Sequence, residues 1–170
     1  VRSAPEEILR TSDKIETLAV DNSNHSLNPD FSEIDTDLIQ GFFDIFNEDA
    51  IAKLESASVS VTPDSISEVV SIYNSFLLSA RFIKCGLVER LAEELVHALP
   101  EIVGSSPAKV SELMAAANLC FRGLYTSLKE HQTERNFWEQ DQSRERYLKL
   151  IGSFEQANQD EVSFKKAADF

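Results

Sequence analysis

The sequence has few of the residues that interrupt helices or staple small folds. Its 170 residues include only five Gly, five Pro and two Cys. Such low Gly and Pro contents are typical of long helices, because folds rich in turns need more of both. The two cysteines, Cys85 and Cys120, are too few for a disulfide framework and have no metal-ligand spacing. We therefore expect both to be buried free thiols in a core built from apolar residues, which make up 42% of the chain.

Sequence motifs for several kinds of chemistry are also missing. The chain has no Gly-rich loop before a helix to bind phosphate, and no G-x-S-x-G motif to present a nucleophilic serine. Its three histidines are far apart, without the spacing that metal centres on helices use. Glu89, Glu93 and His97 follow one another at steps of four, which can hold a cation but is more typical of a helix surface. We predict no catalytic, cofactor or metal site, and a protein that is not an enzyme.

Positive charge is scarce in the first part of the chain. Residues 1–64 contain 4 Lys or Arg against 14 Asp or Glu, and so carry −10 of the formal net charge of −13. Since no compact basic patch is present, we expect neither nucleic acid nor anionic lipid as a partner. A basic partner is weakly favoured, although the excess of acid also serves to keep a Phe-rich chain in solution.

Long apolar runs are absent as well. No segment approaches the roughly 20 apolar residues that a membrane-spanning helix needs, so we expect a soluble protein without a membrane span. The sequence does not fix the cellular compartment of the protein, although an intracellular one is slightly favoured. In an exported protein, Asn24-His25-Ser26 would be an acceptor for N-linked glycosylation.

The first 33 residues are predicted to be separate from the main domain. Residues 5–18 are amphipathic, with Pro5 and two glutamates where a helix would begin, and they predict a short helix. Residues 19–33 are rich in Asn, Ser, Asp and Pro, which predicts a flexible acidic connector. Residues 34–170 are then expected to form a single all-α domain, a bundle of about four main helices with a long C-terminal helical region.

The segment EIDTDLIQGFFDIF, residues 33–46, has two interpretations. Asp35 or Thr36 can cap a helix whose apolar residues recur at steps of three and four: Leu38, Ile39, Phe42, Phe43, Ile45, Phe46, Ala50, Ile51 and Leu54. This stripe predicts a core helix that touches two neighbours. The alternative is an acidic-aromatic recognition motif that folds into the hydrophobic groove of a partner. We favour the core, because the later helices need a partner for their own apolar faces.

The strongest periodicity follows Thr62 and Pro63, which predict a helix start. Apolar residues in heptad register run through Ile66, Val69, Tyr73, Phe76, Ala80, Ile83 and Leu87, and continue at Leu91 and Leu95. The pattern predicts one long central helix, apolar on most sides between Val69 and Ile83, which Gly86 bends or allows to cross a neighbour closely. Pro100 is expected to end it.

The last third of the chain predicts either one helix or two. Ser105 or Ser106 can cap a helix that Pro107 opens, with the stripe Val110, Leu113, Met114, Ala117, Phe121, Leu124, Tyr125 and Leu128. Residues 129–146 are mostly polar, but no Gly or Pro interrupts them. The helix therefore either continues as a rod of about 75 Å, which would project or dimerise, or bends near residues 131–133.

Two adjacent aromatic residues in this polar stretch are the candidate contact site. Neighbouring helix positions point about 100 degrees apart, so a narrow internal stripe would bury Phe137 and Trp138 unequally. Glu134, Arg135 and Arg144 surround them in the sequence, and an apolar centre with a charged rim is typical of interfaces. We predict that these five residues contact a partner protein or a second copy of the chain. Ordinary packing within the chain is the alternative.

Two classes of function remain open at this point. The first is a non-enzymatic interaction module, such as a scaffold, an adaptor or a regulatory binding protein, whose partner is another protein or a second copy. The second is a carrier whose interior encloses an apolar small molecule or lipid among Phe42, Phe43, Phe46, Phe76, Phe82 and Phe121. A helical bundle alone does not decide between them, because many unrelated proteins share this architecture.

Overall fold

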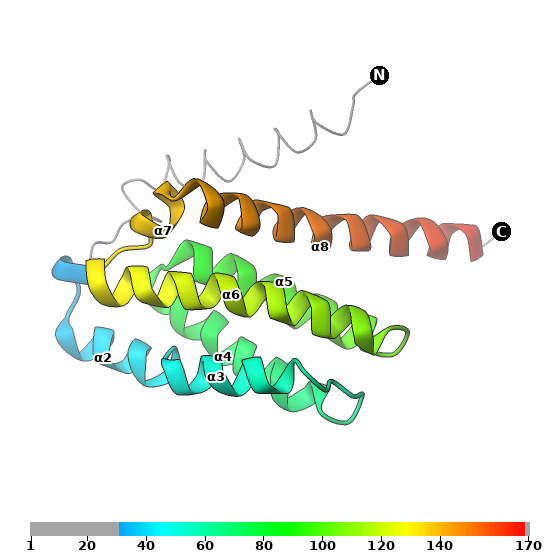
Figure 1. Ribbon diagram of the computed structural model, residues 1–170, viewed down its shortest axis with the longest axis horizontal. Coiled ribbons are helices and arrows are strands. Elements are labelled where there is room, and N and C mark those ends of the chain that lie inside the picture. Colours follow the sequence, from blue (N-terminus) through cyan, green and yellow to red (C-terminus); the bar gives the residue numbers. More distant parts are fainter. Residues whose placement is uncertain (1–30, 169–170) are drawn as a thin grey trace, which may run out of the picture.

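The computed structural model describes residues 31–168, and within them it is all-α, as predicted (Figure 1). The helix predicted over residues 5–18, the rest of the predicted connector before Phe31 and the glycosylation acceptor lie outside the described residues. The elements are η1 (Phe31–Glu33), α2 (Thr36–Ile45), α3 (Glu48–Ala57), α4 (Ile66–Ile83), α5 (Gly86–Val103), α6 (Pro107–His131), α7 (Arg135–Glu139) and α8 (Asp141–Ala168).

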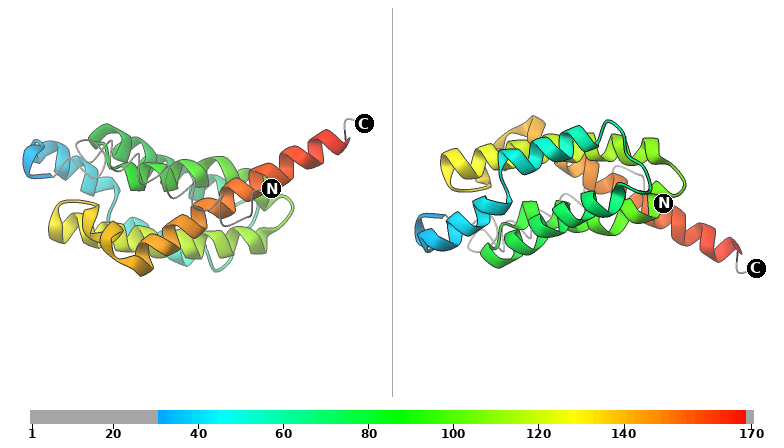
Figure 2. Two further views of the ribbon diagram at one scale, coloured as in Figure 1. Left: turned by 90° about the horizontal axis from the view of Figure 1, so that it is seen from above. Right: turned by 90° about the horizontal axis from the view of Figure 1, so that it is seen from below.

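These helices form an up-and-down bundle. Helices α2 and α3 follow one another along one edge, and α4, α5 and α6 then run back and forth beside them (Figures 1 and 2). Helix α8 lies against α5 and α6. The C-terminal end of α8 extends beyond the turn that joins α5 to α6 (Figure 1). No helix in the described part of the chain has both the length and the apolar character that crossing a bilayer requires.

The predicted helix after Asp35 is divided into α2 and α3 at Phe46 and Asn47. Asp35 caps α2, since its Oδ1 accepts a hydrogen bond of 2.9 Å from the Asp37 N–H. Asn47 joins the two helices: its Nδ2 donates to the Asp44 carbonyl at 2.9 Å, and its Oδ1 accepts from the Ala50 N–H at 2.9 Å. The break leaves Phe46 fully buried between the two helices, so the apolar stripe continues through it.

The prediction of one long helix from Pro63 to Pro100 is wrong, because this segment is the hairpin of α4 and α5. The break is at Lys84, whose φ of 63° places it in the left-handed region, and not at Gly86. The start and the end of the predicted helix also differ from those in the structure. Thr62 and Ser65 close a turn with each other before α4 begins at Ile66, and Pro100 lies inside the last turns of α5. A proline near a helix end removes one hydrogen bond without stopping the helix.

The heptad pattern nevertheless identified core residues in both arms of this hairpin. All nine residues of the pattern, from Ile66 to Leu95, are buried. A heptad pattern shows which face of a helix is apolar, and both arms of the hairpin turn that face toward the same core.

The expectation that the Val69 to Ile83 stretch is the central helix was wrong, because Leu78 and Phe82 are exposed. Helix α6 occupies the central position, since it packs against α3, α5, α7 and α8.

The last third of the chain bends and does not form a rod. Ser106 caps α6 and Pro107 opens it, as predicted. Helix α6 ends at His131, and Gln132 has a φ of 60°, which reverses the chain within the predicted polar bend. The carbonyl of Gln132 accepts a hydrogen bond of 2.9 Å from the Phe31 N–H, so η1 is tied to this turn.

Aromatic rings fill the centre of the bundle. The rings of Phe46 and Phe76 lie 5.0 Å apart and those of Phe76 and Phe121 5.4 Å apart, each pair edge to face. Tyr73 stacks on Phe121 and donates a hydrogen bond of 2.7 Å from its hydroxyl to Asn118 Oδ1. Edge-to-face pairs at these distances are favourable beyond the area that they bury, so the rings join α2, α4 and α6 into one core.

Candidate functional site

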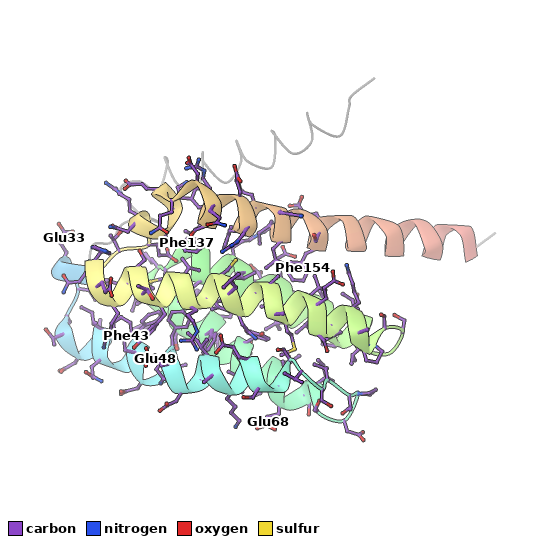
Figure 3. The ribbon with its side chains drawn as sticks, in the orientation of Figure 1. Glu33, Phe43, Glu48, Glu68, Phe137 and Phe154 are labelled. Atoms are coloured by element: carbon purple, nitrogen blue, oxygen red, sulfur yellow. The ribbon has the colours of Figure 1, made fainter. Side chains whose placement is uncertain are left out.

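The predicted contact pair lies in α7, the short helix between α6 and α8. Only 3% of Phe137 and 7% of Trp138 is exposed. The Phe137 ring, labelled in Figure 3, packs on Gly123 of α6, where an added Cβ would lie 3.0 Å from ring carbons. The Trp138 ring lies 5.9 Å from that of Tyr147 on α8. Because α7 has one neighbour on each side, both residues are buried, and contact of this pair with a partner stays a prediction.

The three charged residues predicted around this pair do not form a common rim. Glu134 is only 2% exposed and points into the bundle. Arg135 is exposed. Arg144 pairs with Asp141 at 2.8 Å and donates to the Trp138 carbonyl at 3.2 Å, so it holds the end of α7.

Glu134 caps a helix that is distant in the sequence. Its Oε1 accepts a hydrogen bond of 3.2 Å from the Leu87 N–H, and its Oε2 accepts one of 2.9 Å from the Val88 N–H, both in the first turn of α5. A helix N-terminus has N–H groups without partners and a partial positive charge, so a carboxylate there is favourable. Glu134 thereby fastens the turn between α4 and α5 to the turn between α6 and α7.

Burial dominates the electrostatics around Glu134. It raises the pKa of the Glu134 carboxyl to about 8, although the hydrogen bonds from Val88 and Leu87 lower it. Cys85, which lies beside this turn, has its thiol pKa raised well above the usual value by burial and by the charges of Glu134 and Glu89. A thiol that keeps its proton is a poor nucleophile. The Tyr147 hydroxyl donates a hydrogen bond of 2.7 Å to the Leu87 carbonyl. Glu134 and Tyr147 therefore both hold the first turn of α5 in place.

A shallow cleft lies on the outer side of α6, next to the start of α8. Its volume is about 190 Å³, which is below the roughly 300 to 1,000 Å³ of most small-molecule sites. Two arginines border it, but Arg122 is already held by both oxygens of Glu55. Arg146 is exposed. The cleft offers one available cation and little depth, so we do not assign a ligand to it.

Of the carboxylates on α5, Glu89 and Glu94 are engaged in ion pairs. Glu89 accepts from Arg81 at 3.2 Å, across the hairpin of α4 and α5. Arg90 contacts Glu94 at 3.0 Å, and burial raises the pKa of the Glu94 carboxyl. The described residues contain no cluster of three or more His, Cys, Asp or Glu side chains able to hold a metal ion.

The largest exposed apolar side chains that share a face lie on α2 and α4. Leu38 is 43% exposed and Ile45 40% on α2, while Leu78 is 55% and Phe82 70% exposed on α4. Members of each pair are seven or four positions apart, so each pair shares one side of its helix. We call the surface of these four residues the α2–α4 face.

The antiparallel register of the two helices sets how far along the bundle each pair lies. On α4, Leu78 and Phe82 follow Phe76 by two and six positions and so point about 160 and 120 degrees around the helix from it. Phe46 at the end of α2 packs against Phe76 on α4 at 5.0 Å. Moving back along α2 therefore corresponds to moving forward along α4, which puts Leu38 and Ile45 at the level of Phe82 and Leu78. Figure 2 shows α2 and α4 side by side in the view from below.

Acidic residues without ion pairs border the α2–α4 face. Asp37 and Asp44 are exposed and seven positions apart, next to Leu38 and Ile45 on α2. Neither forms an ion pair with any residue that the structure describes, and the Asp44 carboxylate accepts a hydrogen bond of 2.9 Å from the Gln40 side chain. Glu33 and Glu48, at the two ends of α2, are labelled in Figure 3. The sequence contains no Lys or Arg between Lys14 and Lys53. The fold nevertheless brings Arg122 of α6 near enough to Glu48 for their charges to interact, and Lys129 lies 4.4 Å from the centre of the Phe43 ring on α2.

Sequence reasoning missed this face because it treated all large apolar residues near the stripes as core. One signal for exposed apolar residues was available in the sequence. The apolar stripe on α2 covers more of the helix circumference than a single buried face requires. On α4, the residues at Leu78 and Phe82 fall outside the heptad register that marks the core.

Comparison with known proteins identifies no relative. No family model matches the sequence, and no curated protein or solved structure matches it. The function is therefore argued from the surfaces of this chain.

Proposed function

We propose that the protein is a non-enzymatic protein–protein interaction module, which serves as a scaffold, an adaptor or a regulatory binding protein. The observation that carries this proposal is the α2–α4 face, where four large apolar side chains are 40 to 70% exposed. Single exposed apolar residues, such as Val59 and Leu119, are normal on any protein surface. A group of them with a polar border is instead typical of an interaction site.

The fold supports this function because the face is preformed. Phe42 and Phe46 pack beneath the α2 side of the face, and Phe76 packs beneath the α4 side. These residues are fully or nearly fully buried, so they fix the spacing of the two helices. A rigid surface loses little conformational entropy on binding, which favours affinity.

The alternative function, a carrier of an apolar molecule, is not favoured by a specific observation. Five of the six Phe residues proposed to enclose the ligand contact one another or Tyr residues, so their own rings occupy the space between them. The sixth, Phe82, is 70% exposed on the α2–α4 face and does not belong to the interior.

The test is affinity capture from an extract of the source cells. The full chain is compared with a Leu78→Ser/Phe82→Ser variant and with a control, Leu119→Ser, which removes an apolar side chain of α6 that is 51% exposed. We expect at least one protein to be captured by the wild type and by the control but not by the double variant. All three proteins should have similar melting temperatures, since the changed side chains are exposed. Identical sets of captured proteins would contradict the proposal.

A further inference from the structure

We propose that residues 5–18 of the chain itself dock as an amphipathic helix on the outer side of α4, over Leu78 and Phe82. The contact is argued from α4 alone, from the place where the chain enters the bundle and from the charges at the end of α4. Its consequence rests on the proposed function: the docked segment covers two of the interaction residues, and a partner protein has to displace it.

The outer side of α4 presents an apolar surface to solvent. Leu78 is 55% and Phe82 70% exposed, and the two are one helical turn apart. They point about 160 and 120 degrees around α4 from the buried Phe76, and so away from the core. Toward the start of α4, this side continues with the exposed Ser71 and the half-buried Ser75, which are uncharged. Such a surface suits the apolar stripe of another helix.

Residues 5–18 have a matching stripe in their sequence. Ile8, Thr11, Ile15 and Leu18 follow one another at steps of three, four and three, so in a helix they share one face. An isolated helix of this length is marginal in water. The segment is therefore expected to gain its stability from an apolar surface on which the stripe can pack.

The chain enters the bundle at the end where α4 finishes. The Phe31 N–H donates a hydrogen bond of 2.9 Å to the Gln132 carbonyl, and η1 lies beside the end of α6 (Figure 1). Two positions after Gln132, Glu134 accepts a hydrogen bond from the Leu87 N–H. Leu87 comes three positions after Lys84, at which α4 turns into α5. The N-terminal segment is thus attached close to the last turn of α4.

The connector between the segment and the bundle has a suitable length. Residues 19–30 span at most about 40 Å when extended, and a flexible chain of this length has a root-mean-square end-to-end distance of about 19 Å. A tether this short gives an effective concentration of about 1 mM. A contact with a dissociation constant of about 0.5 mM is then formed about two-thirds of the time. A second copy at micromolar concentration is about a thousandfold less concentrated at the same surface.

The charges at the end of α4 favour an acidic segment. Arg81 and Lys84 are both exposed. Arg81 pairs with Glu89 of α5 at 3.2 Å, whereas Lys84 forms no ion pair with any residue that the structure describes. Residues 5–18 contain four acidic and two basic side chains, so their net charge complements the unpaired lysine.

The acidic residues near α4 do not oppose this contact. A segment tethered at its C-terminal end runs parallel to α4 by the shortest path, and its helical geometry then turns Lys14 toward α2, where Asp44 is exposed. Glu7, on the same flank, lies about 10 Å farther from the tether, past the end of α2. On that part of α4, Glu68 is already paired with Lys53 of α3 at 2.8 Å.

The accessibility of a thiol tests the docking in the full chain. Leu78→Cys is compared with Leu119→Cys, since Leu119 on α6 is 51% exposed and Leu78 55%, while the native Cys85 and Cys120 are each 3% exposed. The rate of reaction with an uncharged maleimide is measured by mass spectrometry. Adding Ile8→Ser/Ile15→Ser/Leu18→Ser should speed the reaction at position 78 about threefold, as two-thirds occupancy predicts. It should leave the rate at position 119 unchanged within about 1.5-fold.

Crosslinking identifies what lies on the surface. A photo-crosslinking amino acid at position 82 of the full chain should react with residues 5–18 of the same molecule. An unchanged rate at position 78 in the segment variant would overturn the inference, as would crosslinks formed only between two copies. Protection of position 78 that rises between 1 and 100 μM protein would likewise assign the surface to a second copy.

Capture from the source extract tests the regulatory consequence. Ile8→Ser/Ile15→Ser/Leu18→Ser should raise the amount of the captured partner about threefold, because the segment no longer competes for Leu78 and Phe82. An unchanged amount would refute the competition. If position 78 shows no protection but Leu78→Ser/Phe82→Ser still loses its partner, the interaction function stands and the docking of residues 5–18 is wrong. If the docking is observed but no partner depends on Leu78 and Phe82, the docking stands and the proposed function is wrong.

Discussion

Replacing Glu134 by Gln should remove a pH dependence from the stability of the protein. The two side chains have nearly the same shape, but Gln has a single oxygen to accept a hydrogen bond. In the variant, one of the two N–H groups of Leu87 and Val88 therefore faces an amide NH2 instead of an acceptor. Leaving one buried donor unpaired costs about 1 to 3 kcal/mol. We expect this loss at pH 5, where the wild-type carboxyl is protonated in the folded state.

The sign of the pH dependence follows from the pKa of Glu134, which burial raises from 4.5 to about 8. Between these values the folded protein holds a proton on Glu134 that the unfolded chain has lost. The stability from this group is therefore complete below about pH 4.5 and is lost as the pH rises toward 8. Wild type should lose about 2 to 2.5 kcal/mol from this residue between pH 5 and pH 7. The variant has no such group, so the difference between the two proteins should shrink over this range.

The assay is denaturant unfolding, followed by circular dichroism at pH 5, 6 and 7. Comparison with Glu134→Gln cancels the other titrating groups, including Glu94, whose carboxyl pKa is also raised by burial. Glu139→Gln, on the exposed side of α7, is the control and should follow the wild type. Parallel profiles for wild type and Glu134→Gln would refute the reasoning. They would show that the two N–H donors and the helix N-terminus keep Glu134 ionised despite its burial.

Three further substitutions test the packing. Phe76→Ala should destabilise the protein by about 3 to 5 kcal/mol in denaturant unfolding, because Phe76 is fully buried among aromatic rings, whereas Phe82→Ala should change stability by less than about 0.5 kcal/mol. Trp138→Ala should cost about 3 to 5 kcal/mol and leave the assembly state measured by light scattering unchanged, since Trp138 packs on Tyr147. Loss of assembly at an unchanged melting temperature would instead support a partner contact at Trp138.

Local signals in the sequence identified much of the fold. The helix starts at Asp35 and at Ser106-Pro107 were predicted because a capping side chain acts on N–H groups two or three residues away. The apolar stripe from Val110 to Leu128 was predicted because helical periodicity needs no knowledge of the partner helix. These features depend on neighbours in the chain, and so they can be read from a short window.

The features that sequence reasoning missed depend on contacts between distant residues. The turn at Lys84 has no Gly, and a lysine in the left-handed region costs about 1 kcal/mol or more relative to the right-handed one. The packing of α4 on α5 and the cap that Glu134 provides to α5 stabilise this turn. Glu134 itself was placed on an exposed rim, because a glutamate in a polar segment is usually exposed. Its 47-residue separation from Leu87 is not visible in any local pattern.

The segment EIDTDLIQGFFDIF illustrates why the choice between core and recognition motif was posed too narrowly. Phe42 and Phe46 are buried, and Phe46 packs against Phe76 of α4 and Phe121 of α6, as a core helix requires. Leu38 and Ile45 lie on the side of α2 next to α4, where the two helices leave them 43% and 40% exposed. The apolar stripe of α2 is therefore wider than one contact surface requires. One edge of it packs in the core, and the other edge is left partly exposed, where it can serve as a docking surface.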